Sequence, residues 1–204
     1  SSVWGGGTSQ SEFEFLTGNS MAFLPPNSVP YQQYLNDDTM SYVWLLKNAG
    51  YETIAFHSYY ASGWNRTKAY EYLGFDDFIS MEDMHEELAF GHQDFCLDEV
   101  DFKEIIYRYE NRDTSKPFFM FNVTMQNHGG YDDFILRDVE VEGTDNAYPK
   151  AEFYLSLVNK TEEAFMDLVD YFSNVDEPTI ILMYGDHQPH VEEEFSFKAM
   201  GIED

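Results

Sequence analysis

The sequence predicts an α/β fold with a mostly parallel central sheet flanked by helices. The first observation is that helix-forming patterns alternate along the chain with short apolar runs typical of buried strands. The second is that polar clusters follow three of those runs, as expected where parallel strands end. The third is composition: 43% of the 204 residues are hydrophobic and 18% are aromatic, which suffices for one substantial core.

The chain is strongly acidic, and this excludes several classes of partner. Its 38 Asp and Glu residues outnumber its 11 Lys and Arg residues, which gives a formal net charge of −27 and a pI near 4.2. Such a surface would repel the phosphates of nucleic acid or of an anionic membrane. Cys96 is the only cysteine, so the sequence also excludes internal disulfides and metal sites built from several cysteines.

No segment of the sequence is expected to cross a membrane or to direct secretion. The longest strongly apolar stretches, 118–125 and 179–184, are too short to span a bilayer. No charged region followed by an apolar core opens the chain. Any targeting segment of the parent protein is therefore expected outside these residues.

The first half of the chain is expected to contain three helices and two strands. Thr8, after three glycines, is expected to be the N-cap of the first helix. Two further helices are predicted over 39–49 and 65–73, each followed by a glycine suited to a C-cap. Strands are predicted over 51–57 and 75–79.

The second half of the chain is expected to contain two helices and two buried strands. The helices are predicted over 97–110 and 151–174, and the strands over 118–125 and 179–185. The acid-rich window 76–113 is expected to be a solvated region, away from the glycine loop and from the aromatic residues near the strand ends.

Polar residues follow three of the predicted strands, in the segments 57–66, 126–131 and 186–190. Because ligands of parallel sheets bind where the strands end at their carboxyl edge, we expect these segments to form one site. Each segment contains at least one histidine, the side chain best suited to proton transfer near neutral pH.

Asp186 and His187 come directly after a predicted strand. A carboxylate and an imidazole on a strand-end loop suit a divalent ion that prefers oxygen and nitrogen, such as Mn²⁺, Mg²⁺ or Zn²⁺. The alternative is a capped turn, in which the aspartate satisfies loop amides and the histidine packs beside it. His190 is interpreted as a substrate contact or a surface residue.

Thr8 lies at a predicted helix start after a glycine-rich loop. Glycines let a phosphate approach the backbone, and a helix N-terminus offers free N–H groups and the positive end of the helix dipole. A hydroxyl at this position can act as a nucleophile with its oxyanion stabilised. The alternative is simple N-capping, and Ser9 and Ser11 are competing hydroxyls.

Further candidate residues lie in the other two polar segments. His128 precedes two glycines and is suited to proton transfer, although it is equally consistent with an incidental loop histidine. His57, Trp64 and Arg66 could line a phosphate pocket, with Arg66 as the cation. The alternatives are a core tryptophan and a salt-bridge arginine. The two histidines of the acidic window, His85 and His92, are interpreted as surface residues.

Four motifs, taken together, resemble the lipoteichoic acid synthase family of sulfatase-like phosphoglycerol transferases in the alkaline phosphatase superfamily. Their order and spacing agree over almost the whole chain. The motifs are Gly7-Thr8-Ser9-Gln10-Ser11-Glu12-Phe13 followed by Leu16-Thr17-Gly18; His57 with Trp64-Asn65-Arg66; Asn127-His128; and Tyr184-Gly185-Asp186-His187.

The resemblance implies a metal-dependent group transfer through a covalent intermediate. Thr8 matches the family's nucleophile, and Thr8, Asp186 and His187 match ligands of one divalent ion, Mn²⁺ or Mg²⁺. His128 matches a catalytic and substrate-binding histidine, and the residues matching His57, Trp64 and Arg66 line the same pocket. The implied substrates are phosphatidylglycerol or a similar phospholipid head group and an alcohol acceptor, either a glycerol phosphate polymer or a glycan.

The resemblance also implies that the chain is one part of a larger protein. The family carries a further glutamate ligand upstream of the threonine, additional elements after the Asp-His motif, and an N-terminal membrane region. We therefore expect residues 1–204 to be a fragment of one extracellular catalytic domain, truncated at both ends, from a membrane-anchored protein. The alternatives are another chemistry of the superfamily (phosphoethanolamine transfer, phosphodiester hydrolysis or sulfate ester hydrolysis), an inactive fragment that lacks one metal ligand, or an acidic binding module.

Overall fold

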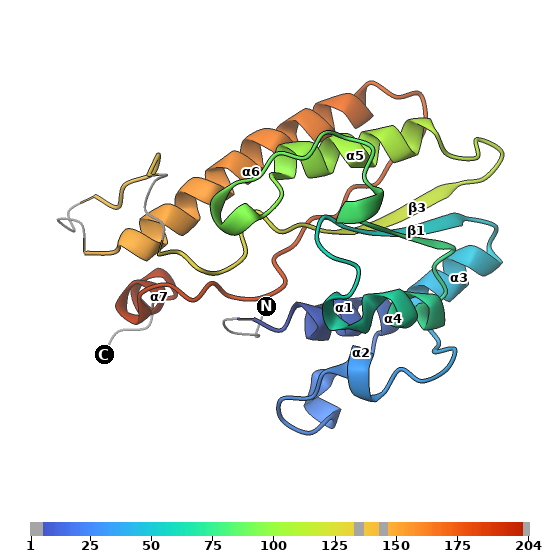
Figure 1. Cartoon of the computed structure of the whole chain (residues 1–204), viewed down its shortest axis with the longest axis horizontal. Coiled ribbons are helices and arrows are strands. Elements are labelled where there is room, and N and C mark those ends of the chain that lie inside the picture. The colour runs from blue at the N-terminus through green and yellow to red at the C-terminus, as the bar shows by residue number, and fades with distance from the viewer. Residues whose placement is uncertain (1–5, 133–136, 143–146, 202–204) are drawn as a thin grey trace.

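The computed structural model describes residues 6–132, 137–142 and 147–201, and it is built around a parallel sheet of three strands. The strands are β1 (Glu52–His57), β2 (Asp77–Ser80) and β3 (Phe118–Val123), in the spatial order β2-β1-β3 (Figure 1). Both ladders are parallel, which confirms the predicted sheet type.

The register of the sheet brings the strand ends together. His57, the last residue of β1, is paired with Ser80 on one side and with Val123 on the other. The loops that leave β1 and β3 therefore start from the same edge, which is where the sequence predicts the ligand site.

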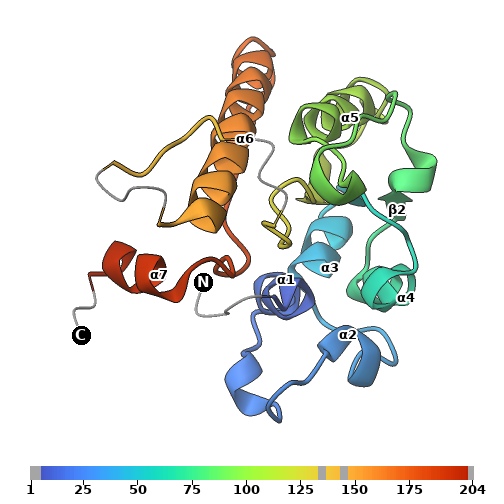
Figure 2. The same cartoon turned by 60° about the vertical axis from the view of Figure 1, so that its left-hand side comes forward.

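Helices cover both faces of the sheet. On one face lie α1 (Thr8–Thr17), α2 (Pro30–Gln33), α3 (Tyr42–Asn48) and α4 (Arg66–Leu73), and on the other α5 (Asp98–Glu110) and α6 (Pro149–Ser173) (Figures 1 and 2). A last helix, α7 (Glu193–Ala199), follows the long loop after α6. Short 3₁₀ turns lie in the described connections, at Met21–Phe23, Gly63–Asn65, Met81–Asp83 and His92–Asp94.

The side chains of β1 alternate between two cores, as the period of a strand requires. Ala55 points to the core formed with α1, α3 and α4, where Leu16, Val43 and Leu73 are fully buried. Its neighbour Phe56 points to the opposite core, against α5. Burial on both faces explains why the middle of β1, residues 54–56, is continuously apolar.

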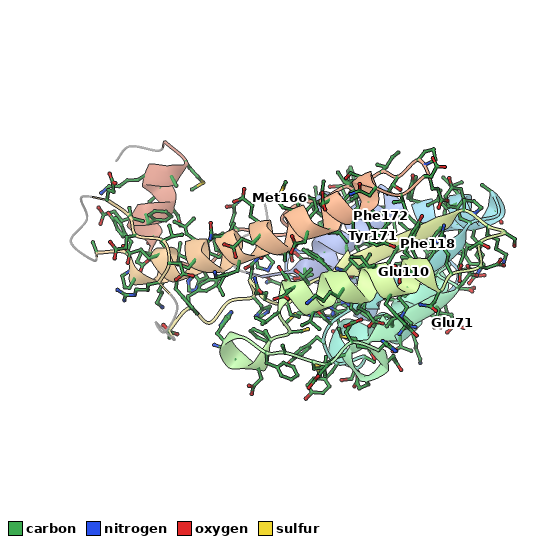
Figure 3. All side chains as sticks on the ribbon, turned by 90° about the horizontal axis from the view of Figure 1, so that it is seen from above. Glu71, Glu110, Phe118, Met166, Tyr171 and Phe172 are labelled. Atoms are coloured by element: carbon green, nitrogen blue, oxygen red, sulfur yellow. The ribbon has the colours of Figure 1, made fainter. Side chains whose placement is uncertain are left out.

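The two long helices of the second face lie side by side. Phe102 of α5 packs against Ala164 and Leu168 of α6. At the far end, the hydroxyl of Tyr171 donates a hydrogen bond to Glu110 at 2.9 Å, close to the start of β3 (Figure 3). This contact fixes the direction of α6 over the sheet.

A glycine C-cap ends α4 where the sequence predicts it, whereas the C-cap of α3 is Ala49 and the predicted Gly50 follows it by one residue. Gly50 and Gly74 have φ values of 93° and 99°, a region that favours glycine. A Cβ atom on Gly74 would lie 2.7 Å from the ring of Trp44, so this position also excludes a side chain on steric grounds.

The predicted strand 179–185 is wrong. This segment forms no ladder with any described strand, and its apolar side chains are exposed, with Ile180 at 94% and Leu182 at 67%. A strand needs a hydrogen-bonded neighbour in addition to β-forming residues. The segment instead contacts α1, where the rings of Tyr184 and Phe15 lie 5.1 Å apart.

The prediction of a solvated face over 76–113 is wrong for three acids of α5. Asp98, Asp101 and Glu104 are fully buried. Asp98 accepts a hydrogen bond from Thr161 at 2.6 Å, and Asp101 accepts one from Asn122. Burial raises the pKa of Asp98 to about 6 and that of Asp101 well above its ordinary value.

Within the described residues, no helix is both long enough and apolar enough to cross a membrane.

Candidate active site

Thr8 is the first residue of α1, and its hydroxyl is free of the capping role. The N-cap is Gly7, with a φ of 103°, and no side chain caps this end of the helix. The expectation that Thr8 is the N-cap is therefore wrong, because Gly7 adopts a left-handed conformation that shifts the start of the helix by one residue. Thr8 is partly exposed at the positive end of the α1 dipole.

The two competing hydroxyls are less available than that of Thr8. Ser9 is fully buried, and its Oγ has no hydrogen-bond partner among the described residues. Ser11 donates its hydroxyl proton to the backbone oxygen of Asp186 at 2.5 Å. Of the three hydroxyls, Thr8 alone is both partly exposed and uncommitted to a described contact.

The same hydrogen bond brings the Asp186–His187 dipeptide to the start of α1. Figure 1 shows the segment between α6 and α7 running back past this end of the helix. The Asp186 carboxylate accepts the backbone N–H of His187 at 2.9 Å and lies 3.5 Å from the His187 ring. His187 Nδ1 lies 3.0 Å from the Gln188 carbonyl oxygen, which assigns the proton to Nδ1 in the neutral ring and leaves Nε2 as the nitrogen with a free lone pair.

Three described residues offer donor types that suit a divalent ion. Asp186, His187 and Thr8 offer a carboxylate, an imidazole and a hydroxyl, a donor set that fits a divalent ion such as Mn²⁺ or Mg²⁺. No cluster of three or more His, Cys, Asp or Glu side chains suited to a metal occurs in the part of the chain that the structure describes. The donors therefore fit the ion without completing its coordination.

His57 is buried at the end of β1 and is held in its neutral form. Its Nδ1 lies 2.8 Å from the carbonyl oxygen of Val123, so Nδ1 carries the proton and Nε2 is an acceptor. Burial, followed by the nearby charge of Arg66, lowers the pKa of His57 to about 4. His57 also lies within electrostatic range of Glu12 and His128, which places these groups in one neighbourhood.

We expect His57 to make the free energy of unfolding depend on pH between about 4 and 6.5. The unfolded chain protonates this imidazole near pH 6.5 and the folded chain only near pH 4, so acidification through this window should cost roughly 3 kcal/mol of stability. Denaturant unfolding of the native protein and of His57→Asn, whose amide can still donate to Val123, measures the difference. The raised pKa of Asp98 acts in the opposite direction in both proteins and cancels in the comparison. If the free energy of unfolding changes with pH equally in the two proteins, His57 is not held neutral in the folded state.

Arg66 lies in a buried ion pair with Glu12. Its Nη2 is 2.5 Å from Glu12 Oε1, and both side chains are 2% exposed. The Tyr70 hydroxyl donates to the other carboxylate oxygen at 2.7 Å. Burial alone would raise the pKa of Glu12, but the Arg66 charge and these two hydrogen bonds hold it below its usual value. The structure thus contains the salt bridge that was the alternative role for Arg66; a phosphate contact stays a prediction.

Trp64 and Asn65 lie in a strained turn just before α4. Their φ values are 56° and 62°, a left-handed region that costs non-glycine residues roughly 1 to 3 kcal/mol each. The Asn65 side chain secures the turn by donating to the Tyr31 carbonyl oxygen at 2.9 Å. The Trp64 side chain is 41% exposed, so the alternative of a core tryptophan is wrong.

His128 is exposed on a loop that a buried amide anchors. Gln126, two residues earlier, accepts the Asp98 backbone N–H at 3.0 Å and donates to Thr161 of α6 at 3.1 Å. Gly130, two residues after His128, is needed for the conformation of the loop. Its φ is 107°, and a Cβ atom there would lie 1.9 Å from the Gln93 amide nitrogen. The loop that presents His128 is therefore fixed on both sides.

His92 differs from its interpretation as a surface residue. It is half-buried, and one ring nitrogen lies 2.9 Å from the Gln126 carbonyl oxygen. The acidic window thus packs against the candidate site and does not lie away from it. His85, with its side chain 58% exposed and its ring stacked on Tyr107 at 3.9 Å, is at the surface as expected.

Sequence reasoning missed the aromatic rings between the two site histidines. Tyr59 lies 6.1 Å from His57 and 6.0 Å from Phe95, whose ring is 5.0 Å from that of His128. The aromatic pair after the first strand, Tyr59-Tyr60, was a visible signal. Glu12 was also missed as the partner of Arg66, although it follows Thr8 by one helical turn.

Comparison with known proteins identifies the family of this chain. A family model described as Sulfatase matches residues 1–201. The chain belongs to the Sulfatase family. A solved structure of a protein in the alkaline phosphatase superfamily, from Vibrio parahaemolyticus, matches 83% of this chain and 40% of its own with a TM-score of 0.59 at 20% identity.

Two curated relatives from Rhizobium meliloti (strain 1021) share this Sulfatase region. The chain is 37% identical over 193 residues to a putative cyclic beta-1,2-glucan modification protein, and 24% identical over 196 residues to the capsular polysaccharide biosynthesis protein RkpI. Each alignment covers 91% of this chain. The chain spans 29% and 33% of the length of these relatives, respectively.

Solved structures of low sequence identity share the Sulfatase fold. The phosphoglycerol transferase GacH from Streptococcus pyogenes, solved in complex with sn-glycerol-1-phosphate, matches 96% of this chain and 52% of its own with a TM-score of 0.79 at 22% identity. The lipoteichoic acid synthase LtaP from Listeria monocytogenes matches 85% of this chain and 42% of its own, with a TM-score of 0.68 at 18% identity. These likenesses confirm the predicted alkaline phosphatase and sulfatase-like fold class.

Proposed function

We propose that this chain carries the catalytic centre of a phosphoglycerol transferase that moves glycerol phosphate from phosphatidylglycerol to an alcohol acceptor. The observation that carries the proposal is the start of α1. There the Thr8 hydroxyl is left free by the Gly7 cap, while Ser11 binds the Asp186 loop at 2.5 Å. A nucleophile, a helix N-terminus and two metal-ligand types therefore meet at one place.

The proposed reaction has two displacements at phosphorus. In the first, Thr8 Oγ1 forms a bond to phosphorus while the bond to the diacylglycerol oxygen breaks, and the Thr8 proton passes to that leaving oxygen. In the second, the acceptor oxygen bonds to phosphorus, the Thr8–phosphorus bond breaks, and the acceptor proton returns to Thr8. His128, exposed on its anchored loop, is the group proposed to carry these protons.

Asp186 and His187, together with the Thr8 oxygen, would hold the divalent ion in this proposal. When bound, Mn²⁺ or Mg²⁺ lowers the pKa of a coordinated hydroxyl and offsets negative charge at phosphorus. The free N–H groups of the first turn of α1 act on the same charge.

The exposure or burial of three side chains indicates how each would contribute to substrate binding in this proposal. Trp64, exposed in its strained turn, would wall the glycerol phosphate pocket. His57 is neutral and can accept a hydrogen bond from a glycerol hydroxyl through Nε2. Arg66, paired with Glu12, would place its positive charge beneath the pocket.

We infer that the acceptor is a glycan and that the reaction takes place at the outer face of the cell membrane. The names of the two curated relatives concern a cyclic glucan and a capsular polysaccharide, which supports a glycan over a glycerol phosphate polymer. The lipoteichoic acid synthase-like family and the membrane attachment of the whole protein are part of the same proposal.

A donor panel tests the proposed chemistry. We expect the full-length protein with Mn²⁺ to release diacylglycerol from phosphatidylglycerol, because the Thr8 site is suited to attack on a phosphodiester. Mass spectrometry of the products with phosphatidylglycerol, phosphatidylethanolamine, a simple phosphodiester and an aryl sulfate separates the chemistries of the superfamily. Turnover of the sulfate or of phosphatidylethanolamine in preference to phosphatidylglycerol would overturn the proposal.

A further inference from the structure

An exposed aromatic ledge lies beside the candidate active site, on the loop between β1 and α4. Tyr60 is 51% exposed, and its ring lies 5.0 Å from that of Tyr59 in an edge-to-face arrangement. The Tyr59 ring packs against Phe95, whose side chain is only 7% exposed and whose ring contacts that of His128. The rings therefore run without a break from the surface at Tyr60 to the proposed proton carrier.

The ledge is held in place by backbone contacts. The Tyr59 carbonyl oxygen accepts the Met81 N–H at 3.0 Å, and the Tyr60 carbonyl oxygen accepts the Gly63 N–H at 3.1 Å. The first bond ties the ledge to the end of β2, and the second ties it to the turn that carries Trp64. An exposed tyrosine on a fixed backbone loses little conformational entropy when it binds a ligand.

The surroundings of the ledge are acidic. The loop after β2 carries Glu82, whose carboxylate accepts the Ala61 N–H at 3.4 Å, directly beside Tyr60. In the described loops 57–65 and 81–97, the charged residues other than histidine are all acids: Glu82, Asp83, Glu86, Glu87 and Asp94. Asp132, in the loop 124–132, is paired with Lys150 at 3.0 Å. A polymer with a negative charge on every unit would be repelled along this rim, whereas an uncharged one would not.

We propose that Tyr60 and Tyr59, backed by Phe95, form an acceptor subsite that stacks against a sugar ring of an uncharged glycan. The face of an aromatic ring carries partial negative charge, which attracts the C–H groups on the face of a pyranose. The ledge ends at His128, so a hydroxyl of the stacked sugar, or of its neighbour, would lie near the group that accepts its proton. This inference rests on the proposed function and specifies its acceptor.

The substitution Tyr60→Ala tests the subsite in the full-length protein. With Mn²⁺ and phosphatidylglycerol, we expect the acceptor KM for an uncharged β-linked gluco-oligosaccharide to rise roughly tenfold, the value of one good aromatic contact. The ratio of transfer to hydrolysis by water should fall by a similar factor. Tyr60→Phe, which retains the ring, should restore both values.

Tyr42→Ala is the matched control, and a second acceptor tests the charge argument. Tyr42 is 49% exposed but contacts Phe119 at the opposite end of the strands, so its loss should leave the acceptor KM unchanged. A glycerol phosphate oligomer of equal length should have a higher KM than the gluco-oligosaccharide. An unchanged KM in Tyr60→Ala, or a preference for the charged oligomer, would overturn the subsite.

A binding measurement separates failure of the subsite from failure of the proposed function. If the native protein does not cleave phosphatidylglycerol, the proposed function fails, but calorimetric titration with the gluco-oligosaccharide still tests the ledge. Binding that is lost in Tyr60→Ala and kept in Tyr42→Ala supports the subsite. Equal affinities for the two variants contradict it.

Discussion

Replacing Thr8 by alanine is expected to lower phosphoglycerol transfer by about 10³-fold or more, because the covalent route loses its nucleophile. The fold should be unaffected. The Thr8 hydroxyl caps no helix end, and alanine has a higher helix propensity than threonine at this position. Intact-mass analysis of the native protein with phosphatidylglycerol and Mn²⁺ should detect a glycerol phosphate adduct that is absent from Thr8→Ala.

Neighbouring hydroxyls provide the controls for this result. Ser9→Ala removes a buried hydroxyl that has no partner among the described residues, so we expect full activity and equal or higher stability. Thr8→Ser retains a hydroxyl and should retain the adduct. Normal turnover by Thr8→Ala, or an adduct that maps to Ser9, would contradict the role proposed for Thr8.

Ser11→Ala addresses the geometry of the site separately from its chemistry. This change removes the 2.5 Å hydrogen bond from α1 to the Asp186 backbone and leaves Thr8 intact. The loop that carries Asp186 and His187, the proposed metal ligands, would then lose this hydrogen bond to the helix. We therefore expect formation of the adduct to depend on both the Thr8 hydroxyl and the position of the Asp186 loop, which belong to separate motifs of the sequence.

The arrangement of elements could be predicted from the sequence because it depends on local signals. The pattern of apolar residues predicts β1, β3, α5 and α6, and Gly74 ends α4 as its C-cap, while Gly50 lies one residue after the C-cap of α3. Parallel pairing follows from the alternation of helices and strands. The polar segments after β1 and β3 then start from one edge because parallel strands end together, whereas Asp186 reaches α1 through the hydrogen bond from Ser11.

The remaining features depend on contacts between distant parts of the chain. The segment 179–185 has the composition of a strand, but composition does not supply the neighbour that a ladder requires. The acids of α5 look solvated in sequence because their partners, such as Thr161 and Asn122, are 63 and 21 residues away, respectively. Tyr59 could not be linked to His128, because Phe95, the ring between them, comes from the acidic window.

Loss of Glu12 is expected to have the largest effect on stability, about 3 to 5 kcal/mol, because it leaves the Arg66 charge buried without a partner. The pair joins α1, which begins with Thr8, to α4, which begins with Arg66. Glu12→Ala should therefore lower the denaturant midpoint strongly. As a control, Glu99→Ala breaks a helical ion pair with Lys103 that is more than half exposed, and it should cost no more than about 0.5 kcal/mol.

A double variant separates the cost of an unpaired charge from the loss of the ion pair itself. In Glu12→Leu with Arg66→Met, both charges are absent and apolar side chains fill the space, so most of the lost stability should return. Tyr70→Phe, which leaves the pair but removes the 2.7 Å hydrogen bond to Glu12, should cost about 1 to 2 kcal/mol. If the double variant is as unstable as Glu12→Ala, the ion pair itself contributes the stability, and α1 and α4 depend on it directly. If it is stable but inactive, the pair serves the proposed active site and is not needed for the stability of the fold.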